Sequence, residues 1–302
     1  MSYGDPQYGN RNGNGNGMGL AVRMIPILIG IVTVGITMAK GCQQGPFGRV
    51  QVVAMNPAQE ATLGLQAFKE VLSDAHVVHG GAAVDAVREI AKRLIRATDN
   101  PDFQKLIGTP IPKFQWELEV VDDKQVNAFC LPGGKIVVYT AILPIAETDA
   151  GLATVIGHEI SHALAHHGAE RMAQQQMVQI GLTSASASMG DMDSSKRQQL
   201  LSVLNAGAKF GILGYSRKHE SEADHMGLLL MAAAGYDPEE TVRFWERMTH
   251  ATSGGQAPPE FMSTHPSHTT RIHDLTAWIA DAKPLYENSN SKSRTEVLPV
   301  FR

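Results

Sequence analysis

The chain has 302 residues, of which 43% are hydrophobic and 19% are charged, and its formal net charge is -4. This composition is that of a globular protein without the basic excess of nucleic-acid-binding proteins, so we expect no nucleic-acid partner. The two cysteines, Cys42 and Cys130, lie too far apart to predict a disulfide framework or a cysteine metal site. Twelve histidines are the unusual feature, and most lie between His158 and His273, where we expect metal chemistry.

The N-terminal region combines a polar head with an apolar segment. Residues 1–18 are mostly Gly, Asn and other polar residues, which predicts disorder. Residues 19–40 follow, and the stretch 20–39 is apolar except for Arg23. Twenty helical residues span about 30 Å, the thickness of a bilayer core, so we predict a single-pass membrane anchor. A signal peptide cleaved near Ala39 is the alternative, and the flanking charges do not fix the orientation.

The remaining chain predicts a mostly helical α+β domain with a small sheet over residues 57–285, after a linker over 41–56. Residues 174–214 are expected to be helical around a loop near Gly190, and the polar tail, 286–302, is expected to be loosely held. The predicted helices are 57–75, 82–97 and 149–171, and the predicted strands are 114–121, 129–131 and 135–139.

The sequence His158-Glu159-Ile160-Ser161-His162 has the spacing of a zinc-binding helix. Residues four apart share one helix face, so both imidazoles can reach one ion. Glu159 then points beside the metal, where a carboxylate acts as a general base rather than as a ligand. Apolar residues before and after the motif predict that this helix is buried.

A catalytic zinc site needs a third protein ligand, and the candidate is Glu220. Asp224 lies four residues later on the same helix face, where it can orient a ligand histidine through the second ring nitrogen. Glu222 points about 200° away from Glu220 and is not expected to join them. The other histidines near the two motifs are interpreted as helix-surface residues: His166, His167, His219 and His225.

The chain resembles the HtpX-like zinc metallopeptidases, a family whose relatives include BepA, the mitochondrial Oma-type proteases and the CAAX prenyl proteases. With a single anchor it is most similar to the BepA and Oma branch. Four segments in the family order carry the resemblance: Asn127 to Gly134, the motif from His158 to His162, Ser216 to Asp224, and Ser263 to Ser267 with Arg271.

The resemblance implies a gluzincin-type fold with one zinc per chain, held by His158, His162 and Glu220, with Glu159 as base and Asp224 behind the ligands. It also places His265 near the metal, where it could close the site or stabilise an oxyanion. Arg271 is expected to hold local structure by pairing with a carboxylate. The strand over Asn127, Ala128, Phe129 and Cys130 is expected to offer an edge to an extended peptide.

These expectations together predict a zinc endopeptidase in which Glu159 takes a proton from an activated water and passes it to the leaving amine. Its expected substrates are unfolded or misassembled membrane or envelope proteins, and its domain is expected to lie outside the cytoplasm. A chaperone or assembly factor with gated or minor proteolysis is the first alternative. A zinc hydrolase acting on a non-peptide bond is the second, and a prenyl-protein protease is disfavoured because the sequence predicts only one span.

Overall fold

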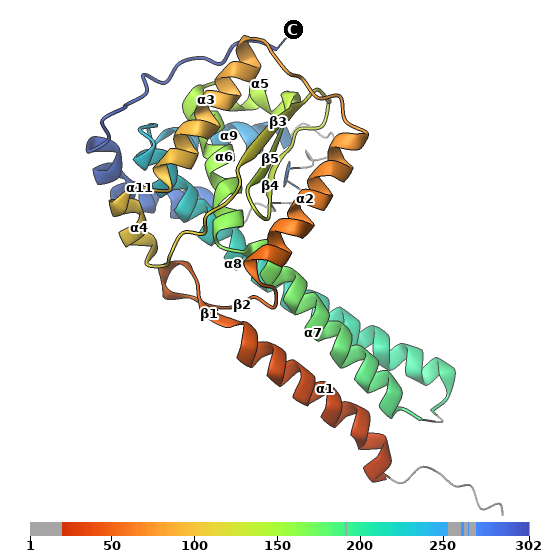
Figure 1. The fold of residues 1–302 in the computed structure, drawn as a ribbon. Coiled ribbons are helices and arrows are strands. Elements are labelled where there is room, and N and C mark those ends of the chain that lie inside the picture. Colours follow the sequence, from red (N-terminus) through yellow and green to blue (C-terminus); the bar gives the residue numbers. More distant parts are fainter. Residues whose placement is uncertain (1–19, 191, 253–260, 263–264, 266–269, 302) are drawn as a thin grey trace, which may run out of the picture.

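The computed structural model describes residues 20–190, 192–252, 261–262, 265 and 270–301, so the predicted disordered head lies outside the described residues. A mixed helical and sheet domain carries three helices that extend away from it side by side (Figure 1). These are α1 (Leu20–Gly41), α7 (His167–Ser188) and the N-terminal part of α8 (Ser194–Ala233). We call these three extended segments the rod. The predicted α+β class is confirmed, and most of the chain is helical.

The sheet has three strands in the order β3-β5-β4. Strand β3 (Glu117–Val121) pairs in parallel with β5 (Lys135–Tyr139), and β4 (Ala128–Leu131) pairs with β5 in antiparallel register. The predicted strands 129–131 and 135–139 are therefore present and pair as a hairpin, and the first strand begins three residues later than the predicted 114. Gly134 closes the turn at a φ of 83°, and a Cβ there would lie 2.7 Å from the Trp116 ring. Strand β4 remains at an edge of the sheet.

Three helices precede the sheet. Helix α2 (Pro57–Ser73) begins with reciprocal hydrogen bonds in which Asn56 and Gln59 each accept from the other's backbone N–H. Helix α3 (Ala82–Ala97) has the predicted limits and buries one apolar face in the core. Helix α4 (Pro101–Ile107) was not predicted, because its seven residues are too few to show a helical period.

The predicted linker over 41–56 contains a short hairpin. Strand β1 (Cys42–Gln44) pairs in antiparallel register with β2 (Val50–Val52), and a 3-10 turn, η1 (Pro46–Gly48), lies between them. In this hairpin Arg49 forms salt bridges with Glu170 of α7 and Glu222 of α8. The segment between the anchor and the domain is therefore part of the folded structure.

The helix predicted over 149–171 is two helices. Helix α6 (Asp149–Leu164) starts at Thr148, whose hydroxyl accepts from the Gly151 N–H. It ends before His166, which has a left-handed φ of 57°, and α7 begins at the next residue. This break separates a helix that is buried on almost all sides from one that leaves the domain.

Helix α6 packs most extensively against α8, and their crossing brings the two predicted motifs together. The contact depends on Gly227 of α8, where a Cβ would lie only 2.9 Å from the backbone nitrogen of His158. A side chain at this position would clash with backbone atoms, so the helices would separate. This close approach brings Glu220 beside His158.

The C-terminal elements cover the rest of α6. The predicted loosely held tail is instead bonded to the start of α6: the Asp149 N–H donates to Glu296 O and the Leu298 N–H donates to Glu147 O, both at 2.9 Å. The Leu298 side chain is also buried. The remaining elements are η2 (Thr140–Ile142), α5 (Leu143–Ala146), α9 (Glu240–Thr252) and α11 (Arg271–Glu287).

Among the helices of the described ranges, α1 is long and apolar enough to cross a membrane. Its candidate span is Ala21–Gly41, with a mean hydropathy of 2.0. Many of its large apolar side chains are exposed, and they include Ile29, Ile31 and Val32. This exposure is what a lipid-facing helix requires.

Candidate active site

The three predicted ligands meet between α6 and α8. His158 and His162 lie one turn apart on α6, and their Nε2 atoms are 3.0 Å apart. The Glu220 carboxylate lies 3.3 Å from His158 Nε2 and 3.5 Å from His162 Nε2. Glu220 is fully buried, so its charge has little access to water.

This donor set fits a zinc ion. Zinc–nitrogen bonds of about 2.0 to 2.1 Å place neighbouring ligand atoms of a tetrahedron about 3.3 to 3.4 Å apart. The three separations above lie around that value, and the ligand atoms of His158, His162, Glu220 and His265 all lie within 4.8 Å of one another. Two or three imidazoles with one carboxylate are also the ligands that zinc accepts readily.

His265 lies at the remaining corner of this group. Its Nδ1 is 3.1 Å from Glu220 Oε2 and 3.3 Å from His158 Nε2. Its Nε2 is 3.4 Å from an Oε1 atom of Glu159. The histidine that the resemblance placed near the metal is therefore close to both the ligands and the candidate base.

Asp224 and Arg271 form a buried layer behind the ligands. Asp224 Oδ1 is 2.9 Å from Nδ1 of His158, which leaves the Nε2 atom of that ring facing the other ligands. Burial opposes protonation of His158, but the carboxylates of Asp224 and Glu220 outweigh it and raise its pKa to about 9. The guanidinium of Arg271 bonds Asp224 at 2.6 Å and Glu220 at 3.1 Å, so its predicted structural pairing is confirmed.

Glu159 has the environment of a general base. Its carboxylate is buried, and burial raises its pKa despite the opposing effects of His265 and His158. The backbone N–H of Cys130 donates a hydrogen bond to it, while its Oε1 atom has no hydrogen-bond partner among the residues that the structure describes. A raised pKa suits a carboxylate that must accept a proton during the reaction.

A cleft opens from Glu159 and His162 to the surface. It runs between β4 and the turn that joins α6 to α7. The lining residues are Glu60, Phe129, Cys130, Leu131, Pro132, Glu159, His162, Ala163, His166, His167, Gly168, Ala169, Arg171 and His265.

The predicted substrate-binding edge is only partly in this cleft. Phe129 and Cys130 line it, but Asn127 and Ala128 do not, and the Ala128 side chain is buried in the core. Strand β4 lies at the edge of the sheet. The backbone N–H of Cys130 in this strand donates to Glu159, so this part of the edge lies beside the candidate base. Burial and Glu159 hold the pKa of the Cys130 thiol well above its ordinary value, which disfavours its reactive thiolate form.

His167 was predicted to lie on a helix surface, and that prediction is wrong. His167 Nδ1 is 2.8 Å from His162 Nδ1, and its Nε2 is 2.9 Å from Glu222. The Nε2 atom of His162 faces the other predicted ligands, so the Nδ1–H of His162 donates to His167, and the Nε2–H of His167 donates to Glu222. The Nε–H of Arg49 completes the chain by donating to Glu222 at 2.7 Å. A ligand histidine is thus oriented through two buried side chains.

His219 is also buried, contrary to prediction. Its ring stacks on His167 at a centroid distance of 4.3 Å, and its Nε2 is 3.0 Å from Glu170. Glu170 accepts in turn from Arg49 at 3.0 Å. One arginine of the linker therefore pairs with two buried carboxylates beside the site.

Two further histidines have partners away from the ligands. His166 lies in the cleft, with Nδ1 2.8 Å from Glu60, and is only partly buried. His225 stacks between Phe47 and Trp278 at centroid distances of 4.6 and 4.5 Å, so it packs β1–β2 against α11 and is not a free surface residue. Glu222 stays out of the ligand set, as predicted.

The chain is similar in sequence to known metalloendopeptidases and proteases. The chain is 37% identical to the mitochondrial metalloendopeptidase OMA1 of Saccharomyces cerevisiae, over 59% of this chain and 51% of that protein. It is 34% identical to the protein of the same name from Schizosaccharomyces pombe, over 78% of this chain and 66% of that protein. It is 26% identical to the beta-barrel assembly-enhancing protease of Yersinia pestis, over 86% of this chain and 51% of that protein.

The chain thus spans about half the length of the Saccharomyces and Yersinia relatives. The model of peptidase family M48 matches residues 85–279, which include the three predicted ligands as well as Glu159, Asp224, His265 and Arg271. The resemblance predicted from the motifs is confirmed: the chain belongs to peptidase family M48.

Proposed function

We propose that this chain is a zinc-dependent endopeptidase that cleaves unfolded or misassembled membrane or envelope proteins. The observation that carries the proposal is the buried group of His158, His162 and Glu220, which meets Glu159 at the inner end of a surface cleft. An edge strand forms one wall of that cleft, which suits an extended peptide of varied sequence.

The residues of the site have separate roles in this proposal. His158, His162 and Glu220 hold zinc, which supplies a Lewis acid for the scissile carbonyl and lowers the pKa of a water. Glu159 takes the proton from that water and delivers it to the leaving amine. Asp224, fixed by Arg271, orients His158, and His167 orients His162.

Removal of the metal tests this proposal. The full chain in detergent should hold about one zinc per molecule and cleave unfolded casein, and 1,10-phenanthroline should abolish cleavage. Zinc should restore it, whereas Mg²⁺ should not, because Mg²⁺ prefers oxygen ligands. Well-folded protein that binds no zinc, shown by elemental analysis beside circular dichroism, would refute the site.

We propose that His265 closes the site as an additional ligand in this conformation, because its Nδ1 lies as close to Glu220 and His158 as the ligands lie to each other. His265→Ala should then cleave casein faster and lose zinc more readily, with affinity lower by about 10- to 100-fold. His273→Ala, in an exposed position of α11, is the matched control. Slower cleavage with zinc retained would instead assign His265 to stabilisation of the transition state.

We also propose that α1 is retained as a single-pass anchor with the domain outside the cytoplasm. Cleavage near Ala39 would remove most of the helix that packs along α7, and the tight contact of Gly30 with Ser184 would be lost. The placement of the domain rests on analogy with single-anchor relatives. Cell fractionation with protease protection tests this placement. A protease added outside the membrane should digest the domain directly, whereas a cytoplasmic domain would be digested only after the membrane is permeabilised.

A further inference from the structure

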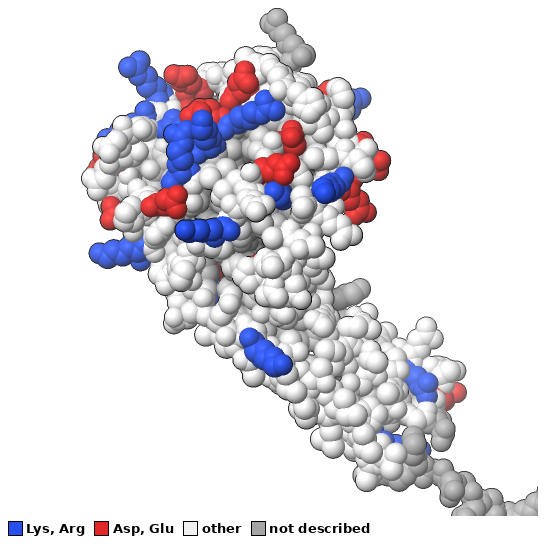
Figure 2. All heavy atoms as spheres, viewed as in Figure 1, with Lys and Arg blue, Asp and Glu red and all other residues white. Residues whose placement is uncertain are grey.

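Each of the three helices of the rod contains a long stretch without charged residues. The longest stretch begins in α7 and has 19 residues, about 28 Å if helical and close to the thickness of a bilayer core, whereas the stretches of α1 and α8 have 16 and 11 residues. Figure 2 shows the result on one face: the rod is almost free of Lys, Arg, Asp and Glu until its tip. The uncharged stretches are residues 24–39, 172–190 and 198–208.

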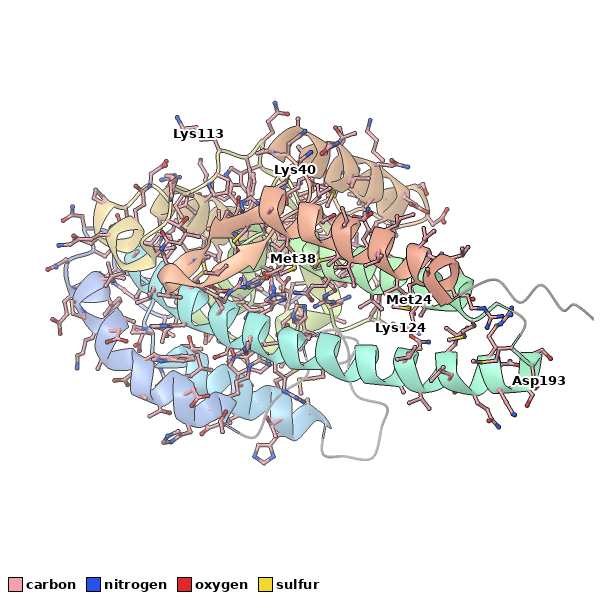
Figure 3. The ribbon with its side chains drawn as sticks, turned by 90° about the horizontal axis from the view of Figure 1, so that it is seen from below. Met24, Met38, Lys40, Lys113, Lys124 and Asp193 are labelled. Carbon is pink, nitrogen blue, oxygen red and sulfur yellow. The ribbon has the colours of Figure 1, made fainter. Side chains whose placement is uncertain are left out.

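Basic residues mark both ends of this uncharged belt. At the far end, the Arg23 guanidinium lies against Gly190, and Figure 3 places Met24 and Asp193 toward that end. Lys40 lies near the domain in the same view. Long basic side chains at the two edges of an apolar slab can extend their charges into water. The basic residues are Arg23, Lys196 and Arg197 at the tip, and Lys40 and Arg171 at the domain end.

The belt exposes apolar as well as polar side chains. A groove between α7 and α8 is lined by Leu182, Ala187 and Leu201 together with polar residues, most of them exposed: Gln179, Thr183, Ser186, Gln198, Ser202 and Asn205. On the outside, Val203 and Leu204 are 67% and 42% exposed. The polar residues of the belt explain why hydropathy identifies only α1 among the described helices.

Several hydroxyls of the belt are satisfied within their own helix. Ser188 donates to the Ser184 carbonyl at 2.8 Å, and Ser202 donates to the Gln199 carbonyl at 2.7 Å. Thr33 in α1 does the same with the Ile29 carbonyl. Such bonds allow a hydroxyl to sit in a helix away from water.

The contact between α1 and α7 uses small residues. A Cβ on Gly30 would lie 2.8 Å from the Ser184 Cβ, so the two helices touch through their backbones and small side chains. Close approach through Gly, Ala and Ser is typical of helices packed within a membrane. It makes α1 and α7 one packed unit rather than an anchor beside a free hairpin.

We propose that residues 172–190 and 192–208 enter the bilayer beside α1 as two antiparallel helical segments, a helical hairpin, so that lipid covers the exposed apolar side chains of the rod. This inference rests on the proposed anchor. It has a consequence for substrates, because Arg171 lies at the domain end of the belt and also lines the catalytic cleft. The cleft then opens at the level of the lipid headgroups, where it meets segments of membrane proteins that have just left the bilayer.

Site-directed spin labelling of the full chain tests the hairpin. Cys42→Ser and Cys130→Ala remove the native thiols, and single cysteines then replace Val203 on α8, Val32 on α1 or Val300 in the tail. All three valines are well exposed, at 67%, 59% and 78%. In phosphatidylcholine–phosphatidylglycerol vesicles, labels at Val203 and Val32 should be relaxed more by oxygen than by a water-soluble nickel chelate. The Val300 label should show the opposite order.

The three positions separate the possible failures. If the Val203 label responds like that at Val300 while the Val32 label stays in lipid, the hairpin lies in water and the inference is wrong. If the Val32 label is itself accessible to the nickel chelate, the proposed anchor fails and the hairpin inference fails with it. Neither result depends on peptidase activity, so the proposed catalytic site is tested separately.

Discussion

Glu159→Gln is expected to abolish casein cleavage while leaving the bound zinc in place. Glutamine keeps nearly the shape of glutamate but cannot accept the proton of the attacking water. General base catalysis contributes about 100- to 10,000-fold to such reactions, so cleavage should fall by on the order of 1,000-fold. Zinc should remain because Glu159 is not one of the grouped ligand residues.

The measurement pairs the cleavage rate with elemental analysis of the same preparation. Glu246→Gln, an exposed carboxylate on α9, is the matched control and should keep the activity of the parent protein. If Glu159→Gln loses zinc, Glu159 is a ligand and the assignment of Glu220 needs revision. If Glu159→Gln keeps both zinc and activity, another group serves as base.

Arg271→Met is expected to be the most destabilising single change behind the site. Arg271 is 1% exposed, bonds Asp224 through two nitrogens at 2.6 and 3.1 Å, and stacks on Trp245 with its central carbon 3.7 Å from the ring centroid. Removing one member of a buried ion pair costs about 3–5 kcal/mol, because the remaining charge is left without a partner. For a chain of this size the thermal midpoint should fall by on the order of 10 °C.

Thermal unfolding with zinc and with chelator measures the effect. Arg96→Met is the matched control, since Arg96 and Glu89 are largely exposed and 3.8 Å apart, and such pairs contribute about 0–1 kcal/mol. Arg271→Lys should fall between the two, because lysine keeps the charge but not the paired hydrogen bonds. A loss for Arg271→Met no larger than that for Arg96→Met would show that Asp224 and Glu220 do not depend on the guanidinium.

The proposed ligands, the candidate base and Asp224 were predictable, because their arrangement depends on spacing within single helices. His158, Glu159 and His162 lie on one turn, and Glu220 and Asp224 lie on one turn of another helix, so each set follows from the helical period. The limits of α3 were predictable for the same reason. The proposed metal roles of these residues remain predictions, since the structure shows only their geometry.

The burial of His167 and His219 was not predictable, because it depends on which elements cover a helix face. His167 and His219 are separated by 52 positions, yet they stack on each other between α7 and α8. Helical spacing gave the direction of each side chain but not the neighbour that buries it. The adjacency of His219 and Glu222 to Glu220 was a usable signal, because a helix that buries one charged residue places its sequence neighbours near other packed elements.

The break between α6 and α7 was missed for a local reason. Left-handed residues at helix ends are usually Gly or Asn, and here the position is occupied by His166. The sequence therefore continued a helical pattern through a point at which the backbone turns. After this turn α7 packs along α1, a contact that the local sequence does not indicate, and Gly168, two residues later, did not identify the turn.

The chain from Arg49 through Glu222 and His167 to His162 has a practical consequence for work on the isolated enzyme. A soluble fragment beginning at residue 50 would lack the guanidinium that Glu170 and Glu222 share. Burial already raises the pKa of Glu222 to about 7 against the opposing effect of Arg49, so in the fragment this carboxyl would take up a proton at neutral pH. His167 would then face a neutral acid, and the kinetics of a fragment trimmed for solubility would be those of a site charged differently from the site in the full chain.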